Sequence, residues 1–244
     1  MSYDGGQREQ TLAAMVDKWT GVGEPLKEAE ARFELGRYLF QLGRGESAFT
    51  ELRRSAELFQ NHDASPLAAQ ALLGCAHALT IVGRVEESLE WFDKSIGLFK
   101  EIGLTSGELE ASAAKLEALL DLQRWNGADL SNKIIMLSEN DSDPQTRVFR
   151  LVAFQYQAQE RLAAQDLKGS LAPAMKAADL ANGVGNTGIE VKLRLFAAHN
   201  LRLLKRLPDA ADQYRRVIKL AQGVPGAASF EEQAIIGLGE VLDG

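Results

Sequence analysis

The sequence has a single cysteine, Cys75, among its 244 residues. A lone thiol cannot form an internal disulfide, and this favours a reducing compartment. No stretch approaches the ~18 consecutive apolar residues of a membrane-spanning helix. The first ten residues, MSYDGGQREQ, are polar and contain no apolar core of a signal peptide. We therefore expect a cytoplasmic protein that does not associate with membranes.

Basic charge is also in short supply. The chain carries 27 lysines and arginines against 34 aspartates and glutamates, which gives a net charge of −7. Proteins that bind the phosphate backbone of DNA or RNA need a basic surface to do so. The charge balance therefore predicts no nucleic-acid partner.

Catalytic motifs are absent as well. The sequence contains no Walker loop, GxSxG, HExxH or dinucleotide fingerprint. His62 falls in a predicted loop, and His77 and His199 fall on first helices that two intervening repeats separate. No metal-binding pair is therefore implied, and a zinc site would need more ligands. The segment GVGEPLKE suggests a phosphate loop, but it has neither a preceding strand nor the GK[ST] ending. We predict that the protein is not an enzyme and holds no metal or cofactor.

Helical periodicity is what the sequence does contain. Apolar residues recur at helical spacing among good helix formers, and the alternation typical of strands is missing. Ser65-Pro66 and Asp143-Pro144 are typical helix starts, whereas Gly43 and Gly83 suit helix ends. The pattern predicts twelve helices: 8–19, 25–42, 45–60, 66–82, 85–101, 106–123, 127–138, 144–164, 169–182, 187–205, 208–222 and 229–242.

A long-period repeat runs through these helices. QLGRGESAFTEL at 41–52 matches IVGRVEESLEWF at 81–92, and GVGEP at 21–25 matches GVGNT at 183–187. Each repeat has a small residue near the start of its second helix, which we call the anchor. The anchors are Ala48, Ser88, Ala128, Ser170 and Ala210. A small anchor predicts that the second helix crosses the first closely there, opposite small residues such as Gly36, Ala76 and Ala198.

The spacing within a repeat, Leu35-Gly36-x-x-Leu39 followed by Ala48-x-x-x-Leu52, resembles the tetratricopeptide repeat (TPR) family. The period of about 40 residues exceeds the usual 34 residues, as in the variant found in kinesin light chains and in some bacterial regulators. The resemblance implies an all-α, right-handed superhelical solenoid of about five antiparallel helix pairs. It also implies three segments: 1–24 with an N-terminal flanking helix, 25–222 with five hairpins, and 223–244 with a C-terminal capping helix.

The resemblance implies that first helices line a concave groove, and that this groove binds a protein or peptide. Carried over to this sequence, the groove consists of Phe33, Arg37, Phe40, Gln41, Gln70, Leu73, His77, Thr80, Ile81, Glu110, Glu117, Leu120, Asp121, Gln155, Gln159, His199 and Arg202. We predict a non-catalytic scaffold or adaptor. The alternative is a sensor that binds a signalling peptide or small ligand and controls a separate effector by changing curvature. A simpler alternative for Phe33, Phe40 and Ile81 is that they belong to the core.

One mode of TPR binding is not expected. The family members that hold the C-terminal carboxylate of heat-shock chaperones use basic and amide side chains at five places. Those places are occupied here by Phe33, Arg37, Gly74, Glu110 and Ala114. Because only Arg37 is basic, we predict no carboxylate clamp.

Arginine follows the turn in four of the five repeats, at Arg44, Arg84, Arg124 and Arg206. A cation near a helix C-terminus stabilises that helix by a few tenths to ~1 kcal/mol. The functional alternative is a basic edge that binds an acidic partner, and we favour the structural interpretation.

Overall fold

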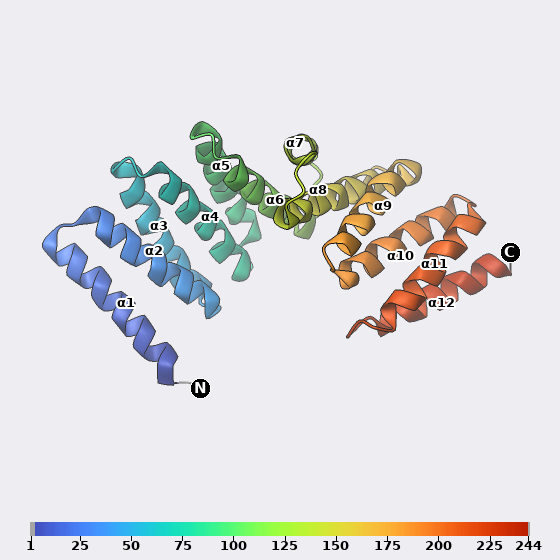
Figure 1. Ribbon diagram of the computed structural model, residues 1–244, viewed down its shortest axis with the longest axis horizontal. Coiled ribbons are helices and arrows are strands. Elements are labelled where there is room, and N and C mark those ends of the chain that lie inside the picture. Colours follow the sequence, from blue (N-terminus) through green and yellow to red (C-terminus); the bar gives the residue numbers. More distant parts are fainter. Residues whose placement is uncertain (1–2, 244) are drawn as a thin grey trace. The chain divides into compact units, whose positions relative to one another are not determined.

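The computed structural model describes residues 3–243, and this part of the chain forms helices and turns without strands (Figure 1). The chain divides into two compact units, residues 1–122 and residues 123–244. Unit 1 contains α1 (Tyr3–Val22), α2 (Pro25–Gln41), α3 (Gly45–Asn61), α4 (Ser65–Ile81), α5 (Val85–Glu101) and α6 (Thr105–Asp121). Unit 2 contains α7 (Ala128–Ser138), α8 (Pro144–Ala163), α9 (Leu167–Gly183), α10 (Thr187–Leu203), α11 (Leu207–Ala221) and α12 (Ala228–Leu242).

Within each unit, every helix packs against the next one along the chain. First helices of successive hairpins also meet: α2 contacts α4, α4 contacts α6, and α10 contacts α12. Each of the twelve predicted segments forms a helix, although α1 is longer than the predicted 8–19. This is the all-α helical-repeat solenoid that the sequence predicts. Among the described residues, no helix has the length and apolarity needed to cross a lipid bilayer.

The same type of turn connects many of the successive helices. After α2, Gly43 has a φ of 73°, and the backbone N–H of Arg44 donates to the carbonyl of Leu39 at 3.0 Å. This is the Schellman arrangement, which satisfies carbonyls at a helix end. Left-handed residues occur at positions 23, 43, 63, 83, 103 and 123, that is, at a constant interval through unit 1 and into the turn that follows it. The recurring Gly-Arg of the sequence is therefore a helix stop followed by the N-cap of the next helix.

The small anchors lie where helices cross closely. Ala48 and Ala210 are fully buried. Opposite Ala48, a Cβ added to Gly36 would come within 2.6 Å of Cγ of Leu52 and 3.3 Å of the Ala48 carbonyl oxygen. Any side chain at Gly36 would therefore push α2 and α3 apart, as predicted from the size of the anchor.

The prediction for the third repeat was wrong in register. Ala128 is only partly buried and is the first residue of α7. The fully buried small residue is Ser131, whose hydroxyl donates to the Ala128 carbonyl at 2.8 Å. The anchors Ser88 and Ser170 make the same bond to carbonyls three residues earlier. The difference arises because the turn before α7 is longer, so α7 begins later. The boundary between the two units also falls here, between α6 and α7.

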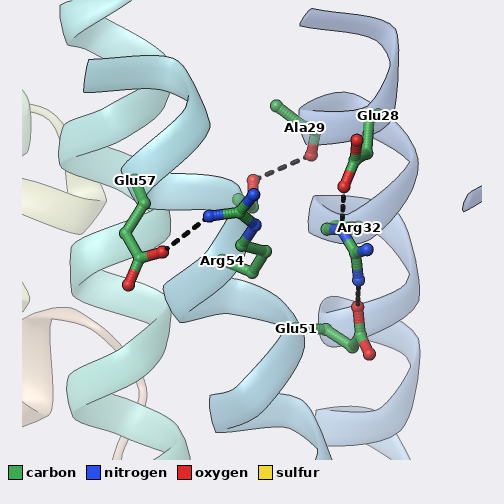
Figure 2. A network of polar contacts seen from close by, with 7 residues as sticks. Glu28, Ala29, Arg32, Glu51, Arg54 and Glu57 are labelled. Carbon is green, nitrogen blue, oxygen red and sulfur yellow. Dashed lines mark hydrogen bonds and ion pairs between the residues drawn. The ribbon is translucent and has the colours of Figure 1, made fainter. Parts of the chain in front are cut away.

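A polar network ties α2 to α3 in unit 1 (Figure 2). The Arg32 guanidinium lies between two carboxylates and donates to Glu28 and to Glu51, each at 2.7 Å. Close by, the Ser55 hydroxyl donates to the Ala29 carbonyl at 2.8 Å. In the next repeat Ser95 makes the equivalent bond to Ala69 at 2.9 Å. The network therefore fixes which turn of α2 faces which turn of α3.

Unit 2 repeats the arginine part of this network at the equivalent positions of α10 and α11, while Val217 takes the place of Ser55. Arg194 donates to Glu190 at 2.6 Å and to Gln213 at 3.3 Å. It also pairs with Asp179 at 3.0 Å. The Arg194 side chain is only 1% exposed, against 19% for Arg32. Where the arginine is fully buried, a neutral glutamine replaces the second glutamate, so fewer charges lose their water. The repetition extends the GVG match of the sequence to contacts in the core.

The lone cysteine lies in the middle of unit 1. Cys75 is on α4 and is fully buried beside Leu52 and Ala78. Burial raises the pKa of its thiol above the ordinary range. The thiol is therefore a protonated, apolar part of the core rather than a nucleophile.

Candidate functional site

Unit 1 contains a cavity of about 560 Å³ between its first helices. Eight of the predicted groove residues line it: Phe33, Arg37, Phe40 and Gln41 of α2, Gln70, Leu73 and His77 of α4, and Glu110 of α6. A volume of this size is within the range of ligand pockets. The cavity is the strongest candidate site in the part of the chain that the structure describes.

Helical spacing brings these side chains together. Positions 33, 37, 40 and 41 lie on one face of α2, and positions 70, 73 and 77 lie on one face of α4. Phe33 and Leu73 occupy the same place in successive repeats, as do Arg37 and His77. Equivalent positions of successive repeats therefore form one surface, because first helices of neighbouring hairpins lie next to one another.

Residues outside the predicted set form the rest of the cavity wall: Leu52, Gly74, Phe99, Leu104, Ser106 and Gly107. Leu52 and Phe99 are core residues of second helices that close the cavity from behind. Gly74 matters because a Cβ there would come within 3.1 Å of Cδ1 of Leu52. Glycine costs stability inside a helix, so Gly74 and Gly107 were the signal that could have identified this wall from the sequence.

The cavity wall combines apolar side chains, several of them aromatic, with polar and charged groups. His77 lies between two rings, with its centroid 6.3 Å from that of Phe40 and 5.6 Å from that of Phe92. Burial lowers the pKa of His77, so the imidazole is neutral at pH 7. Arg37 lies over the Phe33 ring at 5.7 Å and pairs with Glu34 at 3.2 Å. The site thus combines apolar walls with one cation at its rim and hydrogen-bonding groups.

Five predicted residues of unit 1 do not line the cavity: Thr80, Ile81, Glu117, Leu120 and Asp121. They lie in the last turns of α4 and α6. The Thr80 hydroxyl donates to the Ala76 carbonyl of its own helix at 3.0 Å. Ile81 is exposed and therefore does not belong to the core. Whether these residues contact a partner stays a prediction.

The remaining predicted residues, Gln155, Gln159, His199 and Arg202, belong to unit 2. The ring of His199 packs against that of Tyr214 at 5.6 Å. Burial and the nearby Arg202 lower the pKa of His199. Arg202 pairs with Glu240 of α12 at 2.6 Å. On α10, therefore, the chain's own last helix engages part of the surface that was predicted for a partner.

Three of the four arginines that follow the turns, Arg44, Arg84 and Arg206, form ion pairs within the chain. Arg44 reaches Glu9 at 2.7 Å, and Arg206 reaches Asp209 at 2.7 Å. Arg84 bridges Glu46 at 3.0 Å and Glu87 at 2.6 Å. These three side chains are therefore engaged by carboxylates of the chain itself, and the stabilisation of a helix C-terminus stays a prediction. Among the described residues, no group of three or more His, Cys, Asp or Glu side chains is placed to hold a metal ion.

Comparison with known proteins identifies the fold. No family model matches the chain, and no curated protein matches it. Among solved structures, RapI in its apo form has a TM-score of 0.69 at 12% identity, over 99% of this chain and 94% of RapI. The apo form of the quorum sensor NprR from B. thuringiensis has a TM-score of 0.67 at 10% identity, over 95% of this chain and 65% of NprR.

A STAND signal-transduction ATPase with a TPR sensor, from Pyrococcus horikoshii, has a TM-score of 0.76 at 14% identity. The match covers 91% of this chain and 34% of that protein, so this chain spans about a third of its length. Identities this low establish the fold alone.

Proposed function

Because the chain has the helical-repeat fold of TPR proteins, we propose that it is a non-catalytic interaction module and that the cavity of unit 1 binds a peptide segment of a partner protein. The single observation that supports this is the convergence of α2, α4 and α6 on one cavity of about 560 Å³. Repeat proteins present their binding surfaces in this way, with successive repeats supplying equivalent positions.

The chemistry of the cavity indicates what enters it. Phe33, Phe40 and Leu73 offer apolar contact to one large side chain of the peptide. Gln41 and Gln70 each carry an amide, which can both donate to and accept from a peptide backbone. Arg37 and Glu110 place opposite charges at the rim, so a partner segment with both signs of charge fits better than a uniformly acidic or basic one.

The test is to block the cavity without disturbing the core. Ser106 is exposed and lines the cavity, so Ser106→Trp fills its mouth. Gln60→Trp is the matched control, because Gln60 is an exposed neutral residue of unit 1 outside the cavity. The partner captured by the wild type from its native host, identified by cross-linking mass spectrometry, should be lost with Ser106→Trp and kept with Gln60→Trp. An unchanged set of captured proteins would rule the cavity out.

A sensor role is the second candidate. It is favoured by two of the structural matches, which are described as a TPR sensor and a quorum sensor. In that case a short peptide or small ligand from a screening library should raise the melting temperature of the wild type and not that of Ser106→Trp. Ligand stabilisation without any captured protein supports the sensor, and the reverse result supports the adaptor.

A further inference from the structure

Helix α12 occupies the position of a first helix, and within residues 3–243 no helix follows it to form the second helix of a hairpin. Gly237 of α12 packs so closely on Tyr214 that a Cβ would collide with the ring. In unit 1, Gly74 of α4 packs in the same way on Leu52. Leu52 and Tyr214 follow the anchors Ala48 and Ala210 at the same spacing, so α12 corresponds to α4, with Gly237 in the place of Gly74.

The turns that precede the two helices agree with this alignment. The left-handed residue before α4 is Asp63, and the one before α12 is Gly226. Asp63 precedes Gly74 by the same interval as Gly226 precedes Gly237. The correspondence between α4 and α12 therefore holds from the turn to the packing contact without a gap.

Comparison of the two helices shows that a face of α12 is exposed whereas the equivalent face of α4 is buried. Leu72, Leu73 and Leu79 of α4 are 3%, 6% and 0% exposed, whereas their counterparts Ile235, Ile236 and Leu242 are 54%, 56% and 63% exposed. On α4, helix α5 packs over this face, where Leu73 and Ala76 share a cluster with Phe92 and Phe99. No helix of the described chain covers the face of α12 in this way.

On α12, the position that contacts an anchor in the other repeats is also free of close neighbours. Ala76 of α4 is fully buried, and its counterpart on α12 is Gly239. A Cβ at Gly239 would meet nothing within 4 Å. Gly239 thus leaves room for the close approach of a second helix at the place where the repeats of this chain use a small residue.

The other end of the array is built differently. In α1, Leu12, Val16 and Trp19 pack towards α2. The exposed positions are mostly polar, as at Lys18, although Met15 and Val22 are exposed as well. One repeat before Ala48, the place of the anchor is taken by Arg8, so a long charged side chain replaces the small residue. Helix α1 of a second copy therefore lacks the small residue needed to pack on Gly239.

The charge around the exposed face of α12 indicates which kind of helix could bind there. The exposed face of α12 lies between Glu232 and Asp243, and α12 contains no lysine or arginine. Helix α5, which covers α4, carries five acidic residues and two lysines. Like charges at an interface oppose association, so a second copy of this acidic chain fits this face poorly. A helix with basic residues at both ends is complementary to it.

We propose that the exposed face of α12 docks an amphipathic α-helix of another protein, with a small residue opposite Gly239, apolar residues against Ile235, Ile236 and Leu242, and basic residues towards Glu232 and Asp243. Docking completes a hairpin equivalent to the α4–α5 pair. The inference concerns unit 2 and is independent of the cavity in unit 1.

The test uses a defined probe. A fluorescent peptide with the sequence of residues 85–101, in which every acidic residue is replaced by lysine, presents the packing face of α5 with the required charge. Fluorescence anisotropy should show that it binds the full chain, and that Ile235→Gln combined with Ile236→Gln weakens binding at least about tenfold. Gln233→Ala is the matched control on the same helix and should leave the affinity unchanged. Glu232→Gln with Asp243→Asn should weaken binding and reduce its dependence on salt.

Two further controls address specificity. A peptide of the same composition in scrambled order should not bind, and Ser88→Trp within the probe should abolish binding, since it removes the small anchor. Absence of binding, or equal binding by the isoleucine double variant, overturns the proposal. Sedimentation velocity gives the remaining outcome: self-association of the wild type that is lost in the double variant would make a second copy the occupant and would equally overturn it.

Discussion

Two arginines at equivalent positions of the repeat have different environments. Arg194 is almost completely buried with Glu190, while Arg32 keeps some contact with water beside Glu28 and Glu51 (Figure 2). A buried charge that loses its partner costs far more than an exposed one. The internal duplication thus provides a matched comparison of the same ion pair at two depths within one chain.

Arg194→Met tests this difference. It leaves the Glu190 carboxylate buried without a counterion, and we expect the free energy of unfolding to fall by about 3–5 kcal/mol. Arg32→Met is the control, and its smaller expected loss is about 1–2 kcal/mol because water reaches that site. Urea denaturation measures both. Equal losses of the free energy of unfolding in the two variants would contradict the view that the burial of the arginine sets the cost of removing it.

The two partly buried histidines predict a dependence of stability on pH. Burial lowers the pKa of His77 and of His199 in the folded protein. Below about pH 6.5 the unfolded chain binds protons that the folded chain does not, so the free energy of unfolding should fall as the pH drops from about 7.5 to about 5.5. His77→Gln should flatten this dependence, as measured by urea denaturation across that range. A slope that is unchanged by His77→Gln would show that the burial of this residue is not its cause.

At the scale of the element, the turn decides where each helix ends. Most of the left-handed positions are glycine, but Asp63, Gln123, Gln165 and Lys205 adopt positive φ despite carrying side chains. For such residues the left-handed conformation costs roughly 1–2 kcal/mol. The four positions therefore store strain that the packing of the flanking helices offsets, and they are places where the fold overrides local preference.

Lys205→Gly should relieve that strain. Because the substitution also gives the unfolded chain more freedom, we expect a net gain of about 1 kcal/mol in the free energy of unfolding. The reciprocal change, Gly43→Lys, should cost a similar amount at the equivalent turn. Guanidinium denaturation of both variants checks this. A loss of stability in Lys205→Gly would mean that the lysine side chain contributes more than its backbone costs.

At the scale of the whole molecule, each helix packs mainly on its neighbours, and the contacts fall into two units. In such arrays, stability is approximately a sum over repeats and their interfaces. A local defect should consequently loosen its own unit first and leave the other unit close to its normal stability.

Leu52→Ala tests how far a defect spreads. Leu52 packs between α2 and α4 and is almost fully buried, so its truncation should destabilise unit 1 by about 2–5 kcal/mol. Hydrogen exchange followed by mass spectrometry should show faster exchange across residues 25–81 and little change in α8–α11. A uniform rise in exchange throughout residues 3–243 would show instead that the two units unfold together.

Sequence reasoning could identify most of the fold because the relevant signals are local. Periodicity and helix-stop residues such as Gly43 predict the helices, and the small anchors predict their pairing. The predicted register was wrong at Ala128 because the repeat spacing does not reveal that the turn before α7 is longer than the other turns. For the site, helical spacing places Phe33, Arg37 and His77 on one surface. It could not predict the part of Leu52 in closing the cavity, or the pairing of Arg202 with Glu240, because these depend on how separate helices pack.

The buried position of Cys75 also has a practical consequence. Because this thiol is the only one in the sequence and lies at the centre of α4, a thiol-reactive dye can reach it only when unit 1 opens. The labelling rate in native buffer therefore reports how often unit 1 opens, and no other cysteine contributes to the signal. A peptide that fills the neighbouring cavity should lower the labelling rate of Cys75, while a helix docked on α12 should leave that rate unchanged. One reagent therefore distinguishes occupancy of the two surfaces.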